Sequence, residues 1–242
     1  MTQIEVAEDV DALSRMVAQH FVVHTTNAID ARGRCAVALS GGSTPRAIYR
    51  LLGTPAFRDR VRWADIHFFW GDERHVPPDY PDSNYRMAAE AMLSNVPVPS
   101  ANVHRIRAEL PDADQAARDY EAEIRRWFSG GAIPRFDLVH LGVGTDGHTA
   151  SLFPESEALG ETERVCVGNW VAKLGAFRIT LTFPVLNAAR AVVFVAAGQE
   201  KAPIVRRILQ EPNVSPPLPA QLIRPTDGEL WWMLDRAAAG RV

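Results

Sequence analysis

Short apolar runs alternate with amphipathic segments along most of this 242-residue chain, and this alternation constrains the fold most strongly. The runs at residues 34–39, 65–70 and 136–143 are short and strongly apolar, which is typical of strands buried on both faces of a parallel sheet. The segments between them space their apolar residues as amphipathic helices do. Strands that alternate with helices form βαβ units, so the sequence predicts an α/β fold with a mostly parallel sheet and helices on both faces.

The same periodicity predicts where the individual elements lie. Helices are expected at residues 10–31, 44–52, 83–93, 111–128 and 199–209. Strands are expected at residues 34–39, 65–70, 136–143, 164–167, 177–182, 191–196, 220–223 and 230–234. The proline-rich stretch 211–219 is expected to be a surface loop, because too little chain follows it to make a second domain. We therefore expect residues 1–242 to form a single α/β domain.

Composition and charge narrow the range of partners. The formal net charge is −3, whereas a duplex-binding protein usually carries a basic excess, so no nucleic-acid partner is expected. The N-terminal segment has no apolar core and no run is long enough to cross a bilayer, which favours a cytoplasmic protein with no membrane partner. Cys35 and Cys166 lie in separate apolar runs and are expected to be buried thiols. The charge and the lack of an obvious apolar patch favour a monomer or a weak homodimer.

Ligands of open α/β sheets bind beyond the carboxyl ends of the strands, so the loops that follow the strands are the first candidates for a site. The first such loop contains Ser40, Gly41, Gly42 and Ser43. Its glycines let a ligand approach the backbone, and the start of the next helix offers free amides and a favourable dipole for an anion. Ser43 or Thr44 is expected to cap that helix. The loop lacks the lysine of a nucleotide-binding P-loop, so it indicates either a phosphate site or an ordinary capped turn.

The second loop brings four ionisable residues out of a buried strand together, namely Asp72, Glu73, Arg74 and His75. A surface cluster of salt bridges is one interpretation of these residues. The shortness of the loop and its paired prolines favour a functional site instead. Further along, Ser83 is expected to cap a helix, and Asn84 is close enough in sequence to reach the same site.

The third loop, residues 142–148, matches the GxGxxG pattern of dinucleotide-binding proteins. We reject that interpretation because the preceding strand lies in the middle of the chain and Pro154 limits any helix that follows. Asp146 and His148 would also crowd a pyrophosphate. A carboxylate and an imidazole on either side of one glycine can instead perform general base chemistry, with the acid orienting the imidazole. The alternative is a structural histidine, which is the interpretation given to His20, His24, His67, His104 and His140.

Two further basic residues follow later strands. Arg178 opens a predicted strand, and Lys201 lies in the first turn of a predicted helix. A lysine at that position opposes the helix dipole, and a bound anion would remove the conflict. Position alone leaves open whether Lys201 binds an anion or is a solvated surface residue.

Several segments together resemble those of the family that contains 6-phosphogluconolactonase and glucosamine-6-phosphate deaminase. The matching segments are SGGSTPRAIYRLL, FFWGDERHVPPDYPDSNYRMA, DLVHLGVGTDGHTASLFP, RITLTFPVLNAA and GQEKA. The resemblance implies a Rossmann-like α/β fold of the glucosamine-6-phosphate deaminase/ribose-5-phosphate isomerase type. It also implies hydrolysis of 6-phospho-D-glucono-1,5-lactone in the oxidative pentose phosphate pathway, without a metal or an organic cofactor.

The resemblance assigns roles to individual residues. His148 is expected to be the general base that activates water, with Asp146 and Asp72 as the other acid-base candidates. Arg74 and Asp72 are expected to line the sugar site. The residues expected to hold the phosphate are Ser40, Gly41, Gly42, Ser43, Arg46, Arg178 and Lys201. The sequence leaves open whether Asp146 or Asp72 orients His148, and which groups stabilise the oxyanion.

Two other functions are alternatives to lactone hydrolysis. A deaminase or isomerase would use Asp72 to abstract a proton, but the deaminase pattern has a glutamate where this chain has Phe153. A non-catalytic sugar-phosphate sensor usually carries a helix-turn-helix, and no spare segment of this chain is expected to form one. An acyl-enzyme route is not favoured, because the GxSxG nucleophile motif is absent from the sequence.

Overall fold

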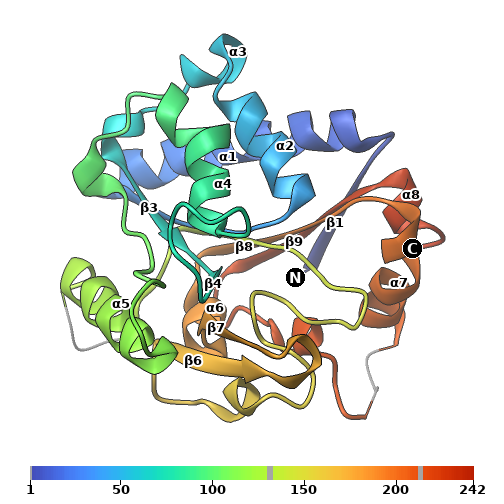
Figure 1. Cartoon of the computed structure of the whole chain (residues 1–242). Helices are drawn as coiled ribbons and strands as arrows, with labels where there is room; N and C mark the ends of the chain where they lie inside the picture. The colour runs from blue at the N-terminus through green and yellow to red at the C-terminus, as the bar shows by residue number, and fades with distance from the viewer. Residues whose placement is uncertain (1, 130–132, 212–214) are drawn as a thin grey trace.

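The computed structural model describes residues 2–129, 133–211 and 215–242 (Figure 1). Its centre is a six-stranded sheet in which every neighbouring pair of strands is parallel. In spatial order the strands are β1 (Thr2–Ala7), β9 (Glu229–Asp235), β8 (Ala191–Ala196), β5 (Leu138–Leu141), β2 (Cys35–Leu39) and β3 (Ile66–Trp70). The predicted parallel sheet is confirmed. Cys35 is buried in β2 as expected, and Cys166 is buried in a strand of a second sheet.

That second sheet has three antiparallel strands, in the order β4 (Asp72–Arg74), β7 (Ala176–Leu181) and β6 (Cys166–Val171). The sequence predicts two strands in this part of the chain but not their separation from the parallel sheet. β4 was not predicted. It follows β3 after one residue, Gly71, and pairs with β7 so that Arg74 lies opposite Arg178. The small sheet therefore carries two predicted site residues on adjacent strands.

Helices cover both faces of the parallel sheet, as predicted (Figure 1). Helices α1, α2 and α4 lie on one face, and α5, α6 and the small sheet lie on the other. The bounds of the helices are α1 (Val10–Arg32), α2 (Ser43–Leu52), α3 (Pro55–Arg58), α4 (Asn84–Ala91), α5 (Ala113–Trp127), α6 (Phe183–Ala188), α7 (Ala202–Gln210) and α8 (Arg236–Ala239). Short 3-10 helices include η4 (Glu157–Gly160), η5 (Ala172–Leu174), η6 (Gln199–Lys201) and η7 (Pro219–Leu222).

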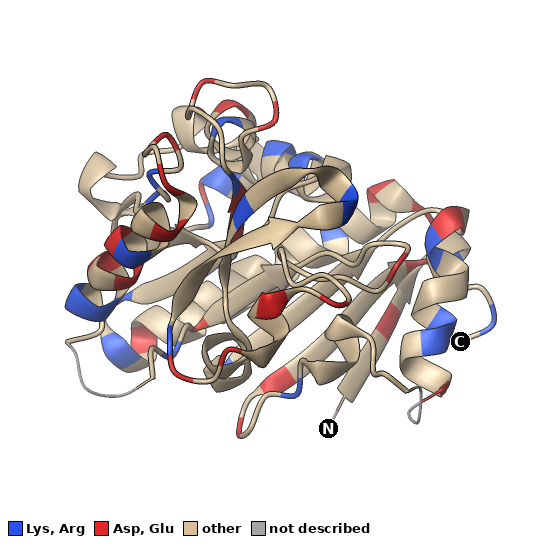
Figure 2. Cartoon of the chain, turned by 60° about the horizontal axis from the view of Figure 1, so that its bottom comes forward, with Lys and Arg blue, Asp and Glu red and all other residues tan. Residues whose placement is uncertain are grey.

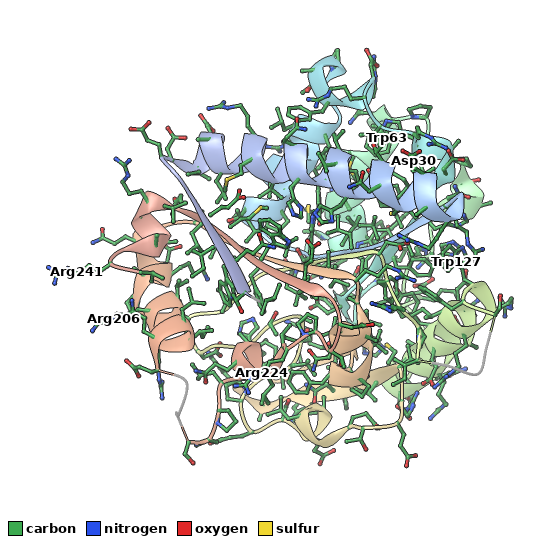
Figure 3. The ribbon with its side chains drawn as sticks, turned by 180° about the vertical axis from the view of Figure 1, so that it is seen from behind. Asp30, Trp63, Trp127, Arg206, Arg224 and Arg241 are labelled. Atoms are coloured by element: carbon green, nitrogen blue, oxygen red, sulfur yellow. The ribbon has the colours of Figure 1, made fainter. Side chains whose placement is uncertain are left out.

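Helix α1 lies across the sheet when the molecule is seen from behind (Figure 3). Leu13, Val17 and Phe21 recur every four residues, and all three are fully buried. Burial of each such side chain contributes about 1.5–3 kcal/mol. The helix begins where the carboxylate of Asp9 accepts a hydrogen bond from an amide of the first turn, and it ends at Gly33 in a left-handed conformation. The predicted bounds of 10–31 therefore agree with the structure to within one residue.

Helix α5 carries acidic and basic residues along its exposed side, where pairs four residues apart form salt bridges (Figure 2). Its opposite side is apolar and packs against β6 and β7. Tyr120 projects from this buried side, and its hydroxyl accepts a hydrogen bond from the amide of Trp70 at 2.7 Å and donates one to the carbonyl of the same residue at 3.0 Å. Trp70 is the last residue of β3, so α5 fixes the point from which the second predicted loop leaves the sheet.

Two local predictions are wrong, and one strand was not predicted. Residues 220–223 do not form a strand; residues 219–222 form η7, in which the side chain of Gln221 accepts a hydrogen bond from the Leu218 amide at 3.0 Å and donates one to the Glu211 carbonyl at 2.9 Å. Strand β1 was not predicted, because its side chains are exposed and give no burial pattern. Helix α2 begins at Ser43 and its N-cap residue is Gly42, so neither Ser43 nor Thr44 caps it.

Two further observations bear on the sequence predictions. Residues 212–214 of the expected proline-rich loop lie outside the described part of the chain. Within residues 2–129, 133–211 and 215–242, no helix is both long enough and apolar enough to cross a membrane.

Candidate active site

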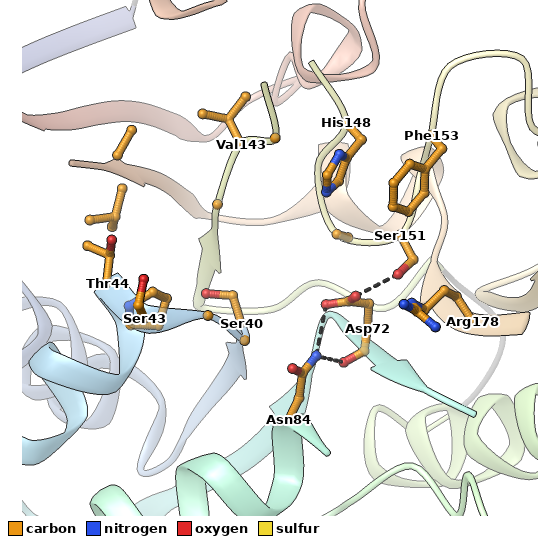
Figure 4. A pocket seen from close by; sticks show the side chains of 18 of the residues that line it. Ser40, Ser43, Thr44, Asp72, Asn84, Val143, His148, Ser151, Phe153 and Arg178 are labelled. Carbon is orange, nitrogen blue, oxygen red and sulfur yellow. Dashed lines mark hydrogen bonds between the residues drawn. The ribbon is translucent and has the colours of Figure 1, made fainter. Parts of the chain in front are cut away.

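A cleft of about 390 Å³ opens where the parallel strands end, between the six-stranded sheet and the small sheet (Figure 4). Most of the predicted site residues line it, namely Ser40, Gly41, Gly42, Ser43, Asp72, Arg74, His148, Arg178 and Lys201. Arg46 lies in an adjoining hollow that shares Gly42, Ser43 and Arg74 with the cleft. Asp146 does not line the cleft but contacts His148 directly. The fold thus brings together side chains that are more than 150 residues apart in the sequence.

The first loop is held at both of its ends. At the end of β2, the Tyr49 hydroxyl accepts a hydrogen bond from the Ser40 amide at 3.0 Å and donates one to the Ser40 carbonyl at 3.1 Å. Gly41 faces Asn84, and a Cβ atom at position 41 would overlap the Asn84 side-chain amide. Gly42 has a φ angle of 110°, which a residue with a side chain rarely adopts. The first turn of α2 receives no side-chain cap, so its amides remain available to an anion.

Asp72 is buried and its carboxylate is already engaged (Figure 4). The Ser151 hydroxyl donates to its Oδ2 at 2.6 Å, and Nδ2 of Asn84 lies 3.4 Å from its Oδ1 and 3.0 Å from its carbonyl oxygen. Ser151 is held in turn, because its carbonyl accepts a hydrogen bond from Asn169. Ser151 and Asn169 were not predicted as site residues, since only the folded chain places them beside Asp72.

The other ionisable residues of the second loop have different surroundings. The carboxylate of Glu73 is buried and accepts hydrogen bonds from the amides of Arg74, Asn84 and Tyr85 at 2.7–2.8 Å and from the Ser83 hydroxyl at 3.1 Å. Burial raises the pKa of Glu73, and the three amides oppose that rise. Glu73 therefore organises the start of α4, and Ser83 caps this helix as predicted.

His75 points away from the cleft. Its Nε2 lies 2.7 Å from the carbonyl oxygen of Leu110, and His75 does not line the cleft. The predicted cluster of four ionisable residues is therefore divided. Asp72 and Arg74 face the cleft, whereas Glu73 and His75 support the surrounding structure.

His148 and Asp146 form a hydrogen-bonded pair. Nδ1 of His148 lies 2.5 Å from Oδ1 of Asp146, and the His148 amide donates to the same oxygen at 3.2 Å. Burial disfavours the charged carboxylate, but hydrogen bonds from Lys173 and His148 outweigh it and hold the pKa of Asp146 well below its usual range. Within the described residues no protein group bonds Nε2 of His148, which leaves that nitrogen to a ligand or water. Asp146, and not Asp72, is the carboxylate that contacts the His148 ring.

The ring of His148 projects into the cleft beside Phe153 (Figure 4). The two rings are stacked with their centroids 4.0 Å apart. Gly144 provides the space for this arrangement, because a Cβ atom there would overlap the His148 ring. The turn itself needs Gly147, whose φ angle is 84°. Two glycines of the rejected dinucleotide pattern, Gly144 and Gly147, therefore help to place the imidazole.

Four cationic side chains line the cleft, namely Arg74, Arg178, Lys201 and Lys173. Burial lowers the pKa of Arg178, and the neighbouring charge of Arg74 lowers it further. A bound anion would compensate both unfavourable effects. Lys173 was not predicted as a site residue, although the sequence holds a signal for it: the chain contains only two lysines, and the other is Lys201.

No group of three or more His, Cys, Asp or Glu residues that could hold a metal ion occurs in the part of the chain that the structure describes. The cleft instead combines one imidazole–carboxylate pair, a buried aspartate and a set of cations. This arrangement suits proton transfer on an anionic substrate.

Comparisons with known proteins agree with this arrangement. The family model described as "Glucosamine-6-phosphate isomerases/6-phosphogluconolactonase" matches residues 8–232. A 6-phosphogluconolactonase of Synechocystis sp. is 45% identical over 216 residues, covering 88% of this chain and 87% of that protein. One from Nostoc sp. is 40% identical over 242 residues, covering 99% and 98%.

The fold has solved counterparts as well. The structure of 6-phosphogluconolactonase from Trypanosoma brucei superposes with a TM-score of 0.89 at 29% identity, covering 100% of this chain and 99% of that one. The matched residues include every strand-end loop that surrounds the cleft. This chain belongs to the glucosamine-6-phosphate isomerase/6-phosphogluconolactonase family.

Proposed function

We propose that this chain hydrolyses 6-phospho-D-glucono-1,5-lactone to 6-phosphogluconate, as a step of the oxidative pentose phosphate pathway, with a water molecule activated by His148. The observation that carries the proposal is the pair of His148 and Asp146, 2.5 Å apart, inside a cleft lined by four cations. The names of the relatives support the choice of substrate.

The chemistry of the pair fits hydrolysis of a lactone. Asp146 bonds Nδ1 of His148 and so favours the tautomer whose Nε2 can accept a proton. Water that attacks the C1 carbonyl loses a proton to Nε2, and the same nitrogen can return it to the ring oxygen as the C1–O bond breaks. Phe153 packs against the imidazole and keeps water from one face of the ring.

The remaining groups account for a phosphorylated, oxygen-rich substrate. We assign the phosphate to the amides that begin α2 together with Arg178 and Lys201, because these groups line the cleft and neither cation forms a salt bridge within the described residues. Arg46, in the adjoining hollow, is assigned a supporting charge only. Ser40 has a buried hydroxyl with no partner among the described residues, so it is available to bond the substrate. Arg74 and Asp72 are assigned to the sugar, with Arg74 as the candidate donor to the oxyanion.

A deaminase or isomerase is the second candidate within the family. That activity would need Asp72 to abstract a proton from carbon, but the Asp72 carboxylate is bonded to Ser151 and Asn84. The glutamate expected for a deaminase is replaced by Phe153, which stacks on His148 and supplies no acid. Both contacts favour the lactonase over the deaminase.

The test generates the lactone in situ from glucose 6-phosphate with its dehydrogenase and follows the release of acid. The purified protein should hydrolyse the lactone well above the spontaneous rate. A rate equal to the spontaneous one would contradict the proposal. Ammonia release from glucosamine 6-phosphate, measured in parallel, should be absent; its presence would favour the deaminase. A sensor without catalytic activity would bind the sugar phosphate, seen as a rise in melting temperature, and leave the lactone unchanged.

Three further predictions accompany this function. We propose that residues 1–242 form one domain, and that the protein acts in the cytoplasm on a small molecule rather than on nucleic acid. A monomer or weak homodimer is also proposed. Trp170 and Phe177 contact each other with ring centroids 4.9 Å apart while both remain about half exposed, so these two rings are the proposed contact of the homodimer. Sedimentation of the wild type and of Trp170→Ala distinguishes the two states.

A further inference from the structure

Lysine is rare in this chain, and both lysines line the cleft. The chain has 26 lysine and arginine residues, of which only Lys173 and Lys201 are lysines. Lys201 lies in η6 beyond β8, on the side of the cleft assigned to the phosphate. Lys173 lies in η5, in the turn between β6 and β7, and the lactonase chemistry described above gives it no role.

Lys173 contacts the carboxylate that orients the general base. Its Nζ lies 2.7 Å from Oδ2 of Asp146, while Oδ1 of Asp146 faces Nδ1 of His148 at 2.5 Å. The three side chains therefore form a chain of contacts from a surface turn to the cleft. The contact also joins two sheets, because Asp146 follows a strand of the parallel sheet and Lys173 follows a strand of the small sheet.

We propose that Lys173 is a positioning residue that acts on His148 through Asp146, by holding one carboxylate oxygen so that the other faces the imidazole. This inference rests on the proposed lactonase function. A free carboxylate can rotate about its Cβ–Cγ bond and offer either oxygen in many orientations. With Oδ2 held by Lys173, Oδ1 remains directed at Nδ1 of His148. The imidazole then keeps the orientation and the tautomer that general base catalysis requires.

The contact is expected to add only a little to the stability of the fold. The Lys173 side chain is 63% exposed, and ion pairs that exposed add little to the free energy of unfolding. Loss of Lys173 should therefore leave the melting temperature nearly unchanged and act on turnover. This separation of the two effects distinguishes a positioning role from a structural one.

Lys173 should also influence the pH dependence of turnover. A proton that binds to the His148–Asp146 pair adds positive charge next to the Lys173 ammonium group, so the lysine opposes protonation. Without this cation, protonation becomes easier, and the acid limb of the pH–rate profile should move to higher pH. The other ionisable side chains that line the cleft stay in place in such a variant: Asp72 and Arg74 on β4, Arg178 on β7 and Lys201 in η6.

The kinetic test compares the wild type with Lys173→Met and Lys173→Arg from about pH 5 to pH 9. Lys173→Met should lower kcat about ten- to a hundredfold, by analogy with the loss of outer-shell groups that orient metal-ligating histidines. KM should change little, and the acid limb should move to higher pH. Lys173→Arg should recover most of the turnover.

A wild-type kcat with an unmoved acid limb in Lys173→Met would overturn the proposal. An equal loss of kcat in Lys173→Met and Lys173→Arg would also overturn it.

Two control variants isolate the effect. Arg236 is an exposed cation on α8 whose guanidinium lies 3.9 Å from Glu8, and Arg236→Gln should leave both kcat and the pH profile unchanged. Lys201→Met removes the other lysine of the cleft and should raise KM without moving the acid limb. A shift of the acid limb in Arg236→Gln would mean that net charge, rather than the contact with Asp146, is responsible.

A spectroscopic test does not depend on turnover. Protein labelled with 13C at the ε carbon of lysine should give two side-chain signals, and Lys201→Arg assigns them. The Lys173 signal should shift as His148 titrates, and this inflection should disappear in His148→Gln. A Lys173 signal with no such inflection would overturn the coupling even if the lactone is hydrolysed. Failure to hydrolyse the lactone would instead overturn the proposed function, so the two failures are distinguishable.

Discussion

A side chain at Gly144 would occupy the space of the His148 imidazole, because a Cβ atom at position 144 would overlap Nδ1 and Cε1 of that ring. The same Cβ would come within 2.7 Å of Oδ1 of Asp146. Gly144 also closes the turn, since its amide donates to the His148 carbonyl at 2.9 Å. The glycine is therefore needed for the space it leaves rather than for an unusual backbone conformation.

Gly144→Ala should displace the imidazole and lower kcat about a hundredfold, because a misplacement of about 1 Å can cost that much in general base catalysis. The measurement is kcat in the coupled lactone assay, with circular dichroism to confirm folding. Gly160→Ala is a matched control, because no atom lies within 4 Å of a Cβ at that position. Wild-type turnover in Gly144→Ala would mean that the position of the imidazole is not critical.

Asp146 should contribute to stability only while it is ionised. Its folded-state pKa is held below its usual range by Lys173 and His148 in spite of burial, so the stabilisation is present above the unfolded-state pKa of about 3.9. The stabilisation is lost as the pH falls through the lower folded-state value. Asp146→Asn should therefore be less stable than the wild type at neutral pH, and the gap should narrow below about pH 4. Urea unfolding of both proteins across this range tests the sign; a gap that widens in acid would contradict it.

A group of buried and half-buried histidines should make the fold sensitive to acid. His20 and His24 on α1 stack with centroids 3.8 Å apart, and both ring nitrogens of His20 are buried without a partner among the described residues. Burial and the neighbouring histidines lower the pKa of His20 to about 3, and burial lowers that of His140 to about 4. Each of these rings takes up a proton more readily in the unfolded chain, whose histidines titrate near pH 6.5. Stability should therefore fall as the pH drops from about 6.5 towards 4.

Replacement of one of these rings should weaken that dependence. Between pH 7 and pH 5, the free energy of unfolding should fall by about 1–2 kcal/mol less in His20→Leu than in the wild type, since one protonation linked to unfolding is removed. Urea unfolding of the wild type and of His20→Leu at both pH values gives the change in unfolding free energy for each protein. Equal losses in the two proteins would exclude His20 as a source of acid sensitivity. The comparison between pH values within each variant cancels any packing change caused by the substitution itself.

The hydroxyl of Tyr120 satisfies both the amide and the carbonyl of Trp70 within the core. Tyr120→Phe should lower the free energy of unfolding by about 1–3 kcal/mol, because both buried backbone groups lose their partner. The melting temperature should fall by about 2–4 °C for each kcal/mol. Tyr80→Phe is the matched control, because the Tyr80 side chain is exposed, and it should melt like the wild type. A Tyr120→Phe protein as stable as the control would show that these hydrogen bonds contribute little.

Much of the fold follows from apolar runs that are visible in the sequence. Strands β2, β3, β5 and β8 are apolar and buried at nearly every position, and β9 is buried over its last four residues, so they could be predicted from the local sequence. β4 escaped prediction because its three residues are polar and become a strand only by pairing with β7, about 100 residues later. β1 was not predicted because it lies at the edge of the sheet and buries almost nothing, so its sequence shows no burial pattern.

The candidate site could also be predicted only in part from the sequence. Its loops could be located because they follow predicted strands, and His148 with Asp146 could be recognised from their spacing. The contacts that give these residues their geometry could not, because they depend on distant parts of the chain. Ser151 bonds Asp72 and Lys173 bonds Asp146 across 79 and 27 residues. Such pairs leave no periodic signal in the sequence.

The most direct test of the account is the lactone assay on His148→Ala beside the wild type. The wild type should hydrolyse the lactone well above the spontaneous rate, and His148→Ala should have a kcat about a hundredfold or more lower, since the general base is lost. His75→Ala serves as the control, because His75 is a histidine of a neighbouring loop outside the cleft, and it should keep near wild-type kcat. Near wild-type turnover in a folded His148→Ala protein would contradict the central claim that His148 activates the water.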